Sequence, residues 1–67
     1  MEKSTLKVLR AKADLTQGEV AEGVGVNRAT YGKWENYESF PNAIQLIKLS
    51  MVFRCSLDAF YFPIETS

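Results

Sequence analysis

Few residue types in this 67-residue chain are suited to catalysis or metal binding. The chain has no histidine and a single cysteine, Cys55, so it offers no Cys–His nucleophile pair, no internal disulfide and no zinc-binding pair. The carboxylates are scattered along the chain, at Glu2, Asp14, Glu19, Glu22, Glu35, Glu38, Asp58 and Glu65. We therefore expect no enzyme, no metal site, no cofactor and no small-molecule substrate.

The basic side chains are the other group that could do chemistry, by contacting phosphates. The net charge is zero, which is a mild argument against nucleic-acid binding, because phosphate contacts need lysine and arginine. The charges are unevenly distributed, however. Residues 1–33 hold six basic and four acidic side chains, whereas residues 34–67 hold two basic and four acidic ones. This polarity suits a protein that approaches DNA with its N-terminal half.

Length and composition indicate one small domain over residues 1–67. An apolar fraction of 46%, with eight aromatic residues, is enough for a single compact core. No apolar run approaches the roughly 20 residues that span a bilayer. The first residues lack the apolar centre of a signal peptide. We therefore expect a cytoplasmic protein with no membrane association.

Hydrophobic periodicity and turn residues predict an all-α fold of short helices. The expected helices are five, over about 4–13, 17–24, 28–36, 43–53 and 57–62, followed by a tail, 63–67. Two pairs of residues have the spacing of a capping box: Thr16 with Glu19, and Asn42 with Gln45. Asn27 and Ser56 are good single N-cap residues. No alternating strand pattern is present.

Apolar positions at helical spacing indicate which faces form the core. Tyr31 and Trp34, three residues apart, are expected to face inward as core residues rather than as stacking platforms for bases. The predicted helix 43–53 has its apolar positions at Ile44, Leu46, Ile47, Leu49 and Phe53.

Residues 17–36 have the features of a helix-turn-helix. Two helices are joined by a three-residue turn, in which Gly25 sits where a positive φ is wanted. Ala21, four residues before this glycine, is small enough for two helices to cross closely. The segment alone is a weakly specific signal.

A longer string of residues makes the signal strong. L-T-Q-x-E-V-A at 15–21, K-W-E-N at 33–36 and S-L-D-A-F at 56–60, together with Pro41, Leu46 and Leu49, occur in order at fixed spacing. With this string the chain resembles the lambda-repressor-like family, also called the Cro/CI or XRE family, over about residues 4–62. The resemblance implies a compact five-helix DNA-binding domain.

The resemblance also implies how the domain would dock. The second helix of the pair would lie in the major groove with its first turns against the base edges. The residues then expected to contact bases are Arg28, Ala29, Thr30 and Lys33, and Arg28 could fork onto a guanine. The residues expected to contact phosphates are Gln17, Asn36 and Tyr37.

Some positions are expected to matter for the scaffold. Arg10 and Glu35 occupy the places of a partly buried ion pair between the first and third helices of phage repressors of this family. Tyr37 and Arg54 stand where the family tends to have glycine with positive φ. Cys55 stands where the family normally has an apolar residue, so the resemblance implies a small buried hydrophobe there. Three glycines inside predicted helices, Gly18, Gly23 and Gly32, should weaken those helices.

A dimer is expected because one recognition helix reads too few base pairs to find a site in a genome. In close relatives the dimer contact involves the start of the last helix. This maps onto Leu57, Asp58, Ala59 and Tyr61, and could extend to Phe62 and Ile64. The apolar tail could equally fold back over the core.

The sequence therefore predicts a small repressor of Cro or immunity type that binds a palindromic operator in double-stranded DNA as a homodimer. A phage, prophage or other mobile element in a bacterial cell is the expected source. Control of a restriction-modification system uses the same fold and stays open. The alternative is a protein-interaction module of this fold, such as an antitoxin or antirepressor partner, with weak or no DNA binding.

Overall fold

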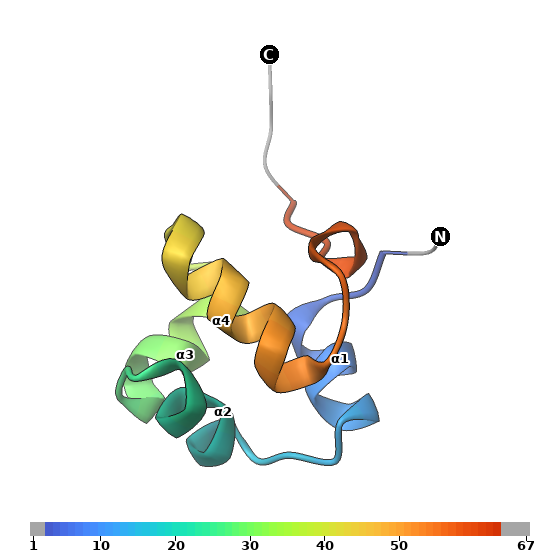
Figure 1. Cartoon of the computed structure of the whole chain (residues 1–67). Helices are drawn as coiled ribbons and strands as arrows, with labels where there is room; N and C mark the ends of the chain where they lie inside the picture. Colours follow the sequence, from blue (N-terminus) through green and yellow to red (C-terminus); the bar gives the residue numbers. More distant parts are fainter. Residues whose placement is uncertain (1–2, 64–67) are drawn as a thin grey trace.

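The computed structural model describes residues 3–63, which form four α-helices and one 3-10 turn. The elements are α1 (Leu6–Lys12), α2 (Gln17–Val24), α3 (Arg28–Glu35), α4 (Ala43–Phe53) and η1 (Leu57–Ala59) (Figure 1). The predicted all-α class is confirmed, and the predicted bounds of α2 and α4 match those observed. The tail beyond Pro63, including Ile64, lies outside the described residues.

The predicted fifth helix over 57–62 is wrong. Only one 3-10 turn forms, because the Ser56 side chain makes no capping hydrogen bond and Phe60 leaves the turn in extended conformation. Phe60 pairs with Ser4 in an isolated parallel bridge, in which the Ser4 N–H donates to the Ala59 carbonyl at 2.8 Å. Because Ser4 is in this bridge and Thr5 is the N-cap, α1 starts at Leu6 rather than near residue 4.

Side-chain capping determines where each of the four α-helices begins, and at α1 the Thr5 hydroxyl accepts from the Val8 N–H at 3.3 Å. In α2 the Thr16 hydroxyl accepts from the Glu19 N–H at 3.1 Å, and the Glu19 carboxylate accepts from the Thr16 N–H at 2.9 Å. The same reciprocal pair forms between Asn42 and Gln45 at the start of α4. At the start of α3 the Asn27 side chain accepts from the Thr30 N–H. These contacts satisfy N–H groups that have no partner within a helix.

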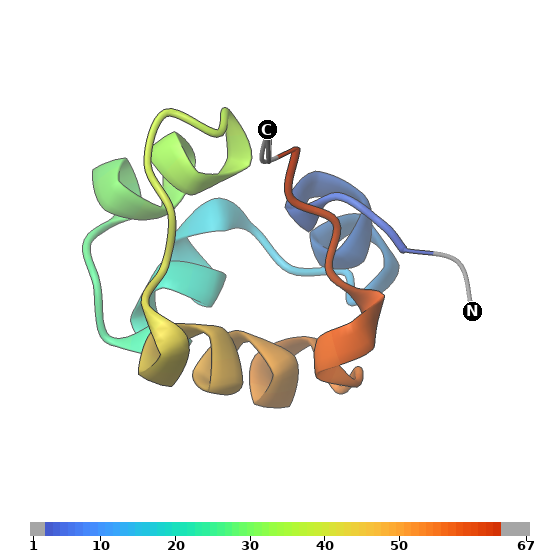
Figure 2. The same ribbon diagram turned by 90° about the horizontal axis from the view of Figure 1, so that it is seen from above.

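The core lies where α2 packs against α3 and α4 (Figure 2). Its buried members come from every helix and from the bridge; they are Leu6, Leu9, Val20, Ala21, Val24, Tyr31, Trp34, Leu49, Phe53 and Phe60. Cys55 packs against this core but is only half-buried, not fully buried as expected. Burial raises the pKa of its thiol.

The predicted apolar face of α4 is partly wrong. Leu46, Leu49 and Phe53, which repeat at spacings of three and four, face the core. Ile44 and Ile47 lie on another side of the helix and are 67% and 48% exposed. Periodicity could not decide between these two stripes, because both have helical spacing.

The C-terminal segment folds back over the loop that precedes α4. The Phe62 ring makes edge contacts with the rings of Tyr37 and Phe40, with centroids 6.1 and 6.0 Å apart. The Tyr37 hydroxyl donates to the Tyr61 carbonyl at 3.1 Å. This segment was expected either to extend the dimer contact or to fold back over the core, and Phe62 therefore folds back.

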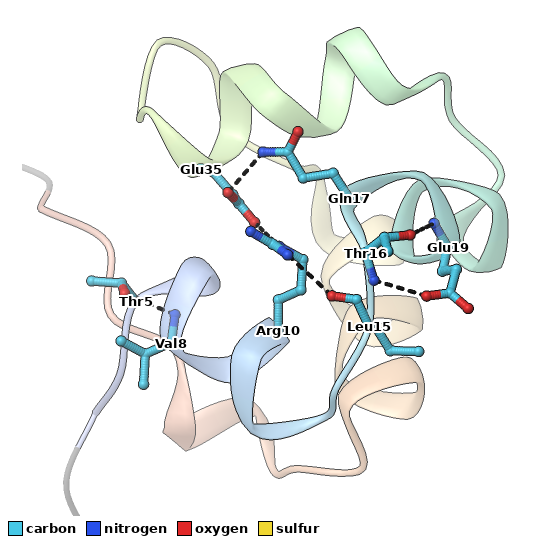
Figure 3. A network of polar contacts seen from close by, with 8 residues as sticks. All are labelled: Thr5, Val8, Arg10, Leu15, Thr16, Gln17, Glu19 and Glu35. Carbon is cyan, nitrogen blue, oxygen red and sulfur yellow. Dashed lines mark hydrogen bonds and ion pairs between the residues drawn. The ribbon is translucent and has the colours of Figure 1, made fainter.

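A polar network links α1, α2 and α3 (Figure 3). Arg10 of α1 donates through Nε to Glu35 of α3 at 2.5 Å, and through Nη1 to the Leu15 carbonyl at 3.0 Å. Gln17, the first residue of α2, donates to the other oxygen of Glu35 at 2.9 Å. The predicted ion pair is present, and Glu35 joins three helices.

The network sets the protonation of its members. Burial alone would raise the pKa of Glu35, but hydrogen bonds from Arg10 and Gln17 outweigh it and hold the pKa below its ordinary value. The hydrogen bond to Glu35 raises the pKa of Arg10. The Tyr31 hydroxyl beside them is buried and makes no hydrogen bond of good geometry with the described residues. Burial and the charge of Glu35 raise its pKa, so it stays protonated.

Within residues 3–63, four residues have a left-handed backbone. A positive φ was expected at Gly25, Tyr37 and Arg54, and the observed φ angles are 89°, 59° and 54°. At Tyr37 and Arg54 the side chain makes this conformation costly. Asp14, with φ 58°, was not foreseen. Both Tyr37 and Arg54 follow the end of a helix, where this conformation lets the chain turn.

The close crossing of α2 and α4 explains one glycine inside a helix. A Cβ on Gly23 would lie 2.9 Å from a methyl carbon of Val52, a β-branched side chain with little freedom to move. Gly23 therefore permits the crossing. None of the helices within residues 3–63 is long and apolar enough to cross a membrane.

Relief of backbone strain should be measurable at Arg54. We expect Arg54→Gly to raise the free energy of unfolding by about 0.5–1 kcal/mol, because glycine adopts positive φ without a Cβ clash. Arg54→Ala is the matched control, since it removes the same exposed side chain but keeps the strain. Urea unfolding that shows equal stability for the two variants would contradict this account.

The stabilising effect of Glu35 should depend on pH. Because its pKa is lower in the folded protein, its contribution is complete above the unfolded pKa of about 4.3 and is lost as pH falls through the folded pKa. We expect Glu35→Gln to lower stability at pH 7 by about 1–3 kcal/mol, and by less at pH 3. Glu22→Gln, an exposed control on α2, should show no such pattern. A Glu35→Gln deficit that is independent of pH would disprove the assignment.

Candidate nucleic-acid interface

The two sides of α3 differ in burial and charge. Tyr31 and Trp34 are buried against the core, with their rings in an edge contact at 6.1 Å. Arg28, Ala29 and Lys33 project from the other sides of the helix and are exposed. The helical repeat of 3.6 residues produces this division. A basic outer face is therefore carried on an aromatic anchor.

The remaining expected base contact, Thr30, is half-buried. Its N–H is not free to donate to an outside partner, because it donates to the Asn27 side chain at 2.7 Å. Its hydroxyl and methyl are only partly accessible. The four residues predicted to contact bases therefore lie on one helix but are not equally available.

The turn before α3 is fixed by backbone hydrogen bonds. The N–H groups of Gly25 and Val26 both donate to the Ala21 carbonyl, at 2.9 and 3.0 Å. Val26 packs against the core, and Asn27 then caps α3. This local geometry sets the angle at which Arg28, the first residue of α3, leaves the scaffold.

An open hollow of about 520 Å³ lies between the start of α2 and the start of α3. Six residues line it: Arg10, Leu15, Thr16, Gln17, Gly18 and Arg28. Two guanidinium groups and the N-terminus of α2, where N–H groups lack helical acceptors, make the hollow suited to an anion such as phosphate. The residues that line the hollow indicate no other chemistry.

The hollow joins residues that the sequence analysis treated separately. Gln17 was expected at a phosphate and Arg28 at a base, and both line it. Arg10 was expected only in the ion pair, so its place in the hollow was missed. No sequence signal could have found it, because the hollow depends on how three segments meet. In the structure Nε and Nη1 of Arg10 bind within the chain, and Nη2 remains for another acceptor.

The side chain of Gln17, predicted to contact a phosphate, also makes a hydrogen bond within the chain. One amide hydrogen is directed to Glu35, which holds the side chain beside α3 (Figure 3). The amide nitrogen carries two hydrogens, so one remains for a phosphate oxygen. Glu35 thus positions both Arg10 and Gln17 at the rim of the hollow.

The two other predicted phosphate contacts, Asn36 and Tyr37, differ in exposure and in whether their donors are used within the chain. Asn36 is exposed, and its side-chain amide makes only a long hydrogen bond of 3.4 Å to Glu38. Tyr37 is half-buried, its N–H donates to the Trp34 carbonyl and its hydroxyl to the Tyr61 carbonyl. Both donors of Tyr37 are therefore used within the chain, which favours a structural role for this residue.

The turn η1, which carries Leu57, Asp58 and Ala59, lies across the molecule from α3 in both ribbon views (Figures 1 and 2). Tyr61 lies nearer the end of α3, since its carbonyl accepts from the Tyr37 hydroxyl. Leu57, Asp58 and Tyr61 are exposed, whereas Ala59 is half-buried against the core. Leu57 and Tyr61 are 49% and 45% exposed, so they offer apolar surface to a second chain.

Comparison with known proteins gives two findings. A helix-turn-helix family model matches residues 6–60. The fold is similar to that of the P22 c2 repressor protein in complex with the synthetic operator 9T in the presence of Tl⁺. The two chains share 32% identity with a TM-score of 0.74, over 79% of this chain and 80% of that one. No curated protein sequence matches the chain.

The family model covers most of the chain, including every helix described above. The repressor agrees with it in both sequence and fold. The chain belongs to the lambda-repressor-like helix-turn-helix family.

Proposed function

We propose that this chain is a sequence-specific DNA-binding repressor that inserts α3 into the major groove. The observation that carries the proposal is the exposed basic face of α3 beside the anion-suited hollow at the start of α2. A groove reader needs both, because phosphate contacts position a protein and base contacts specify the sequence. The similar P22 c2 repressor, solved with a synthetic operator, supports the same function here.

The hollow and the helix face would act together. A backbone phosphate at the hollow would meet Arg10, Gln17 and the first N–H groups of α2, which would set the register of the domain on the duplex. Arg28, at the border between the hollow and the outer face, would then reach the O6 and N7 of a guanine. Lys33, more than one turn further along α3, would contact a neighbouring base or phosphate.

The other residues predicted to contact DNA are not equally accessible in this arrangement. Ala29 is exposed and its methyl suits the thymine methyl group. Thr30, being half-buried, would offer only a partial contact. Asn36 is the phosphate contact beyond the end of α3.

We propose that the repressor acts as a homodimer on a palindromic operator in a bacterial cell, with its half-sites about one helical turn, roughly 34 Å, apart. Leu57, Asp58 and Tyr61 supply exposed surface for the contact between the two copies. The place of η1, away from α3, leaves the reading face open to DNA.

A protein-interaction module is the second candidate, and one observation favours it. The outward side of α4 exposes Ile44, Ile47 and Met51, which repeat at spacings of three and four and are 67%, 48% and 71% exposed. An apolar stripe of this kind is typical of a surface that meets another protein. On this reading DNA binding would be weak or absent.

Selection of bound duplexes from a random pool separates the two candidates. We expect enrichment of an inverted repeat, with affinity that falls steeply as salt rises because counterions are released from the DNA. Failure to enrich any duplex even at low salt would reject the repressor and favour the interaction module.

Arg28→Ala tests the reading face directly. We expect it to weaken binding to the selected duplex by about 1–3 kcal/mol and to relax the preference at one base position in each half-site. Lys48→Ala, which removes an exposed basic residue from α4, is the control and should retain the preference at every position. Arg28 would be excluded from base reading if its variant kept the full sequence preference.

A further inference from the structure

Gly32, in the middle of α3, is a glycine that neither the fold nor the hollow explains. Gly25 is needed for its positive φ and Gly23 for the crossing with Val52. Gly18 lines the hollow at the start of α2. Gly32, in contrast, has ordinary helical conformation, and beyond the backbone of α3 a Cβ on it would meet none of the described atoms within 4 Å.

An alanine at position 32 would therefore fit the isolated protein and would strengthen α3, because glycine is a poor helix former. The helix is only eight residues long and carries the proposed reading face. A glycine at its centre lowers stability without a benefit to the described part of the chain. The benefit of the glycine must therefore come from a contact outside the described part of the chain.

The position of Gly32 indicates where that benefit lies. It is four residues after Arg28 and four before Asn36, so the three share one row along the helix. Both neighbours in the row are exposed. In the proposed complex Arg28 reaches a base and Asn36 a phosphate, so the stretch of duplex between them passes over Gly32.

We propose that Gly32 is a close-approach position, at which the α3 backbone rests directly against the edge of the DNA duplex. The inference rests on the proposed function and adds a residue that determines how deeply α3 enters the groove. A side chain at position 32 would hold the helix away from the duplex and lengthen the contacts of Arg28 and Lys33. Its effect would grow with its size.

The test compares Gly32→Ala and Gly32→Leu on the duplex selected by the unchanged protein, with Kd from fluorescence anisotropy and Tm from circular dichroism. We expect Gly32→Ala to raise Tm but to weaken binding about tenfold, as an overpacked contact would, and Gly32→Leu to weaken binding further. Ser50→Ala is the control, because it raises helix propensity on α4 and should leave Kd unchanged.

The outcomes separate this inference from the function on which it rests. If the unchanged protein binds no duplex, the proposed function fails and the inference fails with it. If the unchanged protein binds and Gly32→Ala binds equally well or more tightly, only the close approach is overturned. The alanine variant decides the matter even if the leucine variant does not fold, since its Cβ would meet no described atom within 4 Å beyond its chain neighbours and the backbone of its own helix.

Discussion

The contact between Arg10 and Glu35 fixes the relation between α1 and α3 on which the proposed interface depends. Glu35 lies at the end of α3, so a shift of this helix would separate its carboxylate from both Arg10 and Gln17. Tyr31 and Trp34 hold the same helix from behind through apolar burial. Burial is not directional, whereas a hydrogen-bonded ion pair is, so the network supplies the orientation that packing alone would leave loose.

The same network prepares the hollow between α2 and α3. Holding Arg10 and Gln17 in place reduces the side-chain entropy that would otherwise be lost when an anion binds. The net charge of zero is compatible with this function, because the acidic Glu35 positions basic and polar groups instead of opposing DNA at the surface. A neutral chain can therefore present a locally basic face, although its long-range attraction to DNA is small.

Local signals predicted much of this structure, and long-range contacts account for what they missed. The reciprocal caps at Thr16 and Asn42 involve residues three apart, so the sequence determined where α2 and α4 begin. The bridge between Ser4 and Phe60, which replaces the expected last helix, joins residues at opposite ends of the chain and has no local signal. The ion pair came from the family resemblance, but the hollow required coordinates, because it depends on how three segments meet.

The central claim is that the outer face of α3 and the start of α2 meet DNA together. Amide chemical-shift mapping by NMR, with the selected duplex titrated into labelled protein, tests it most directly. The account predicts the largest changes at Gln17 and Gly18 and along α3 from Arg28 to Lys33. Changes confined to the exposed side of α4, around Ile44 and Met51, would contradict it.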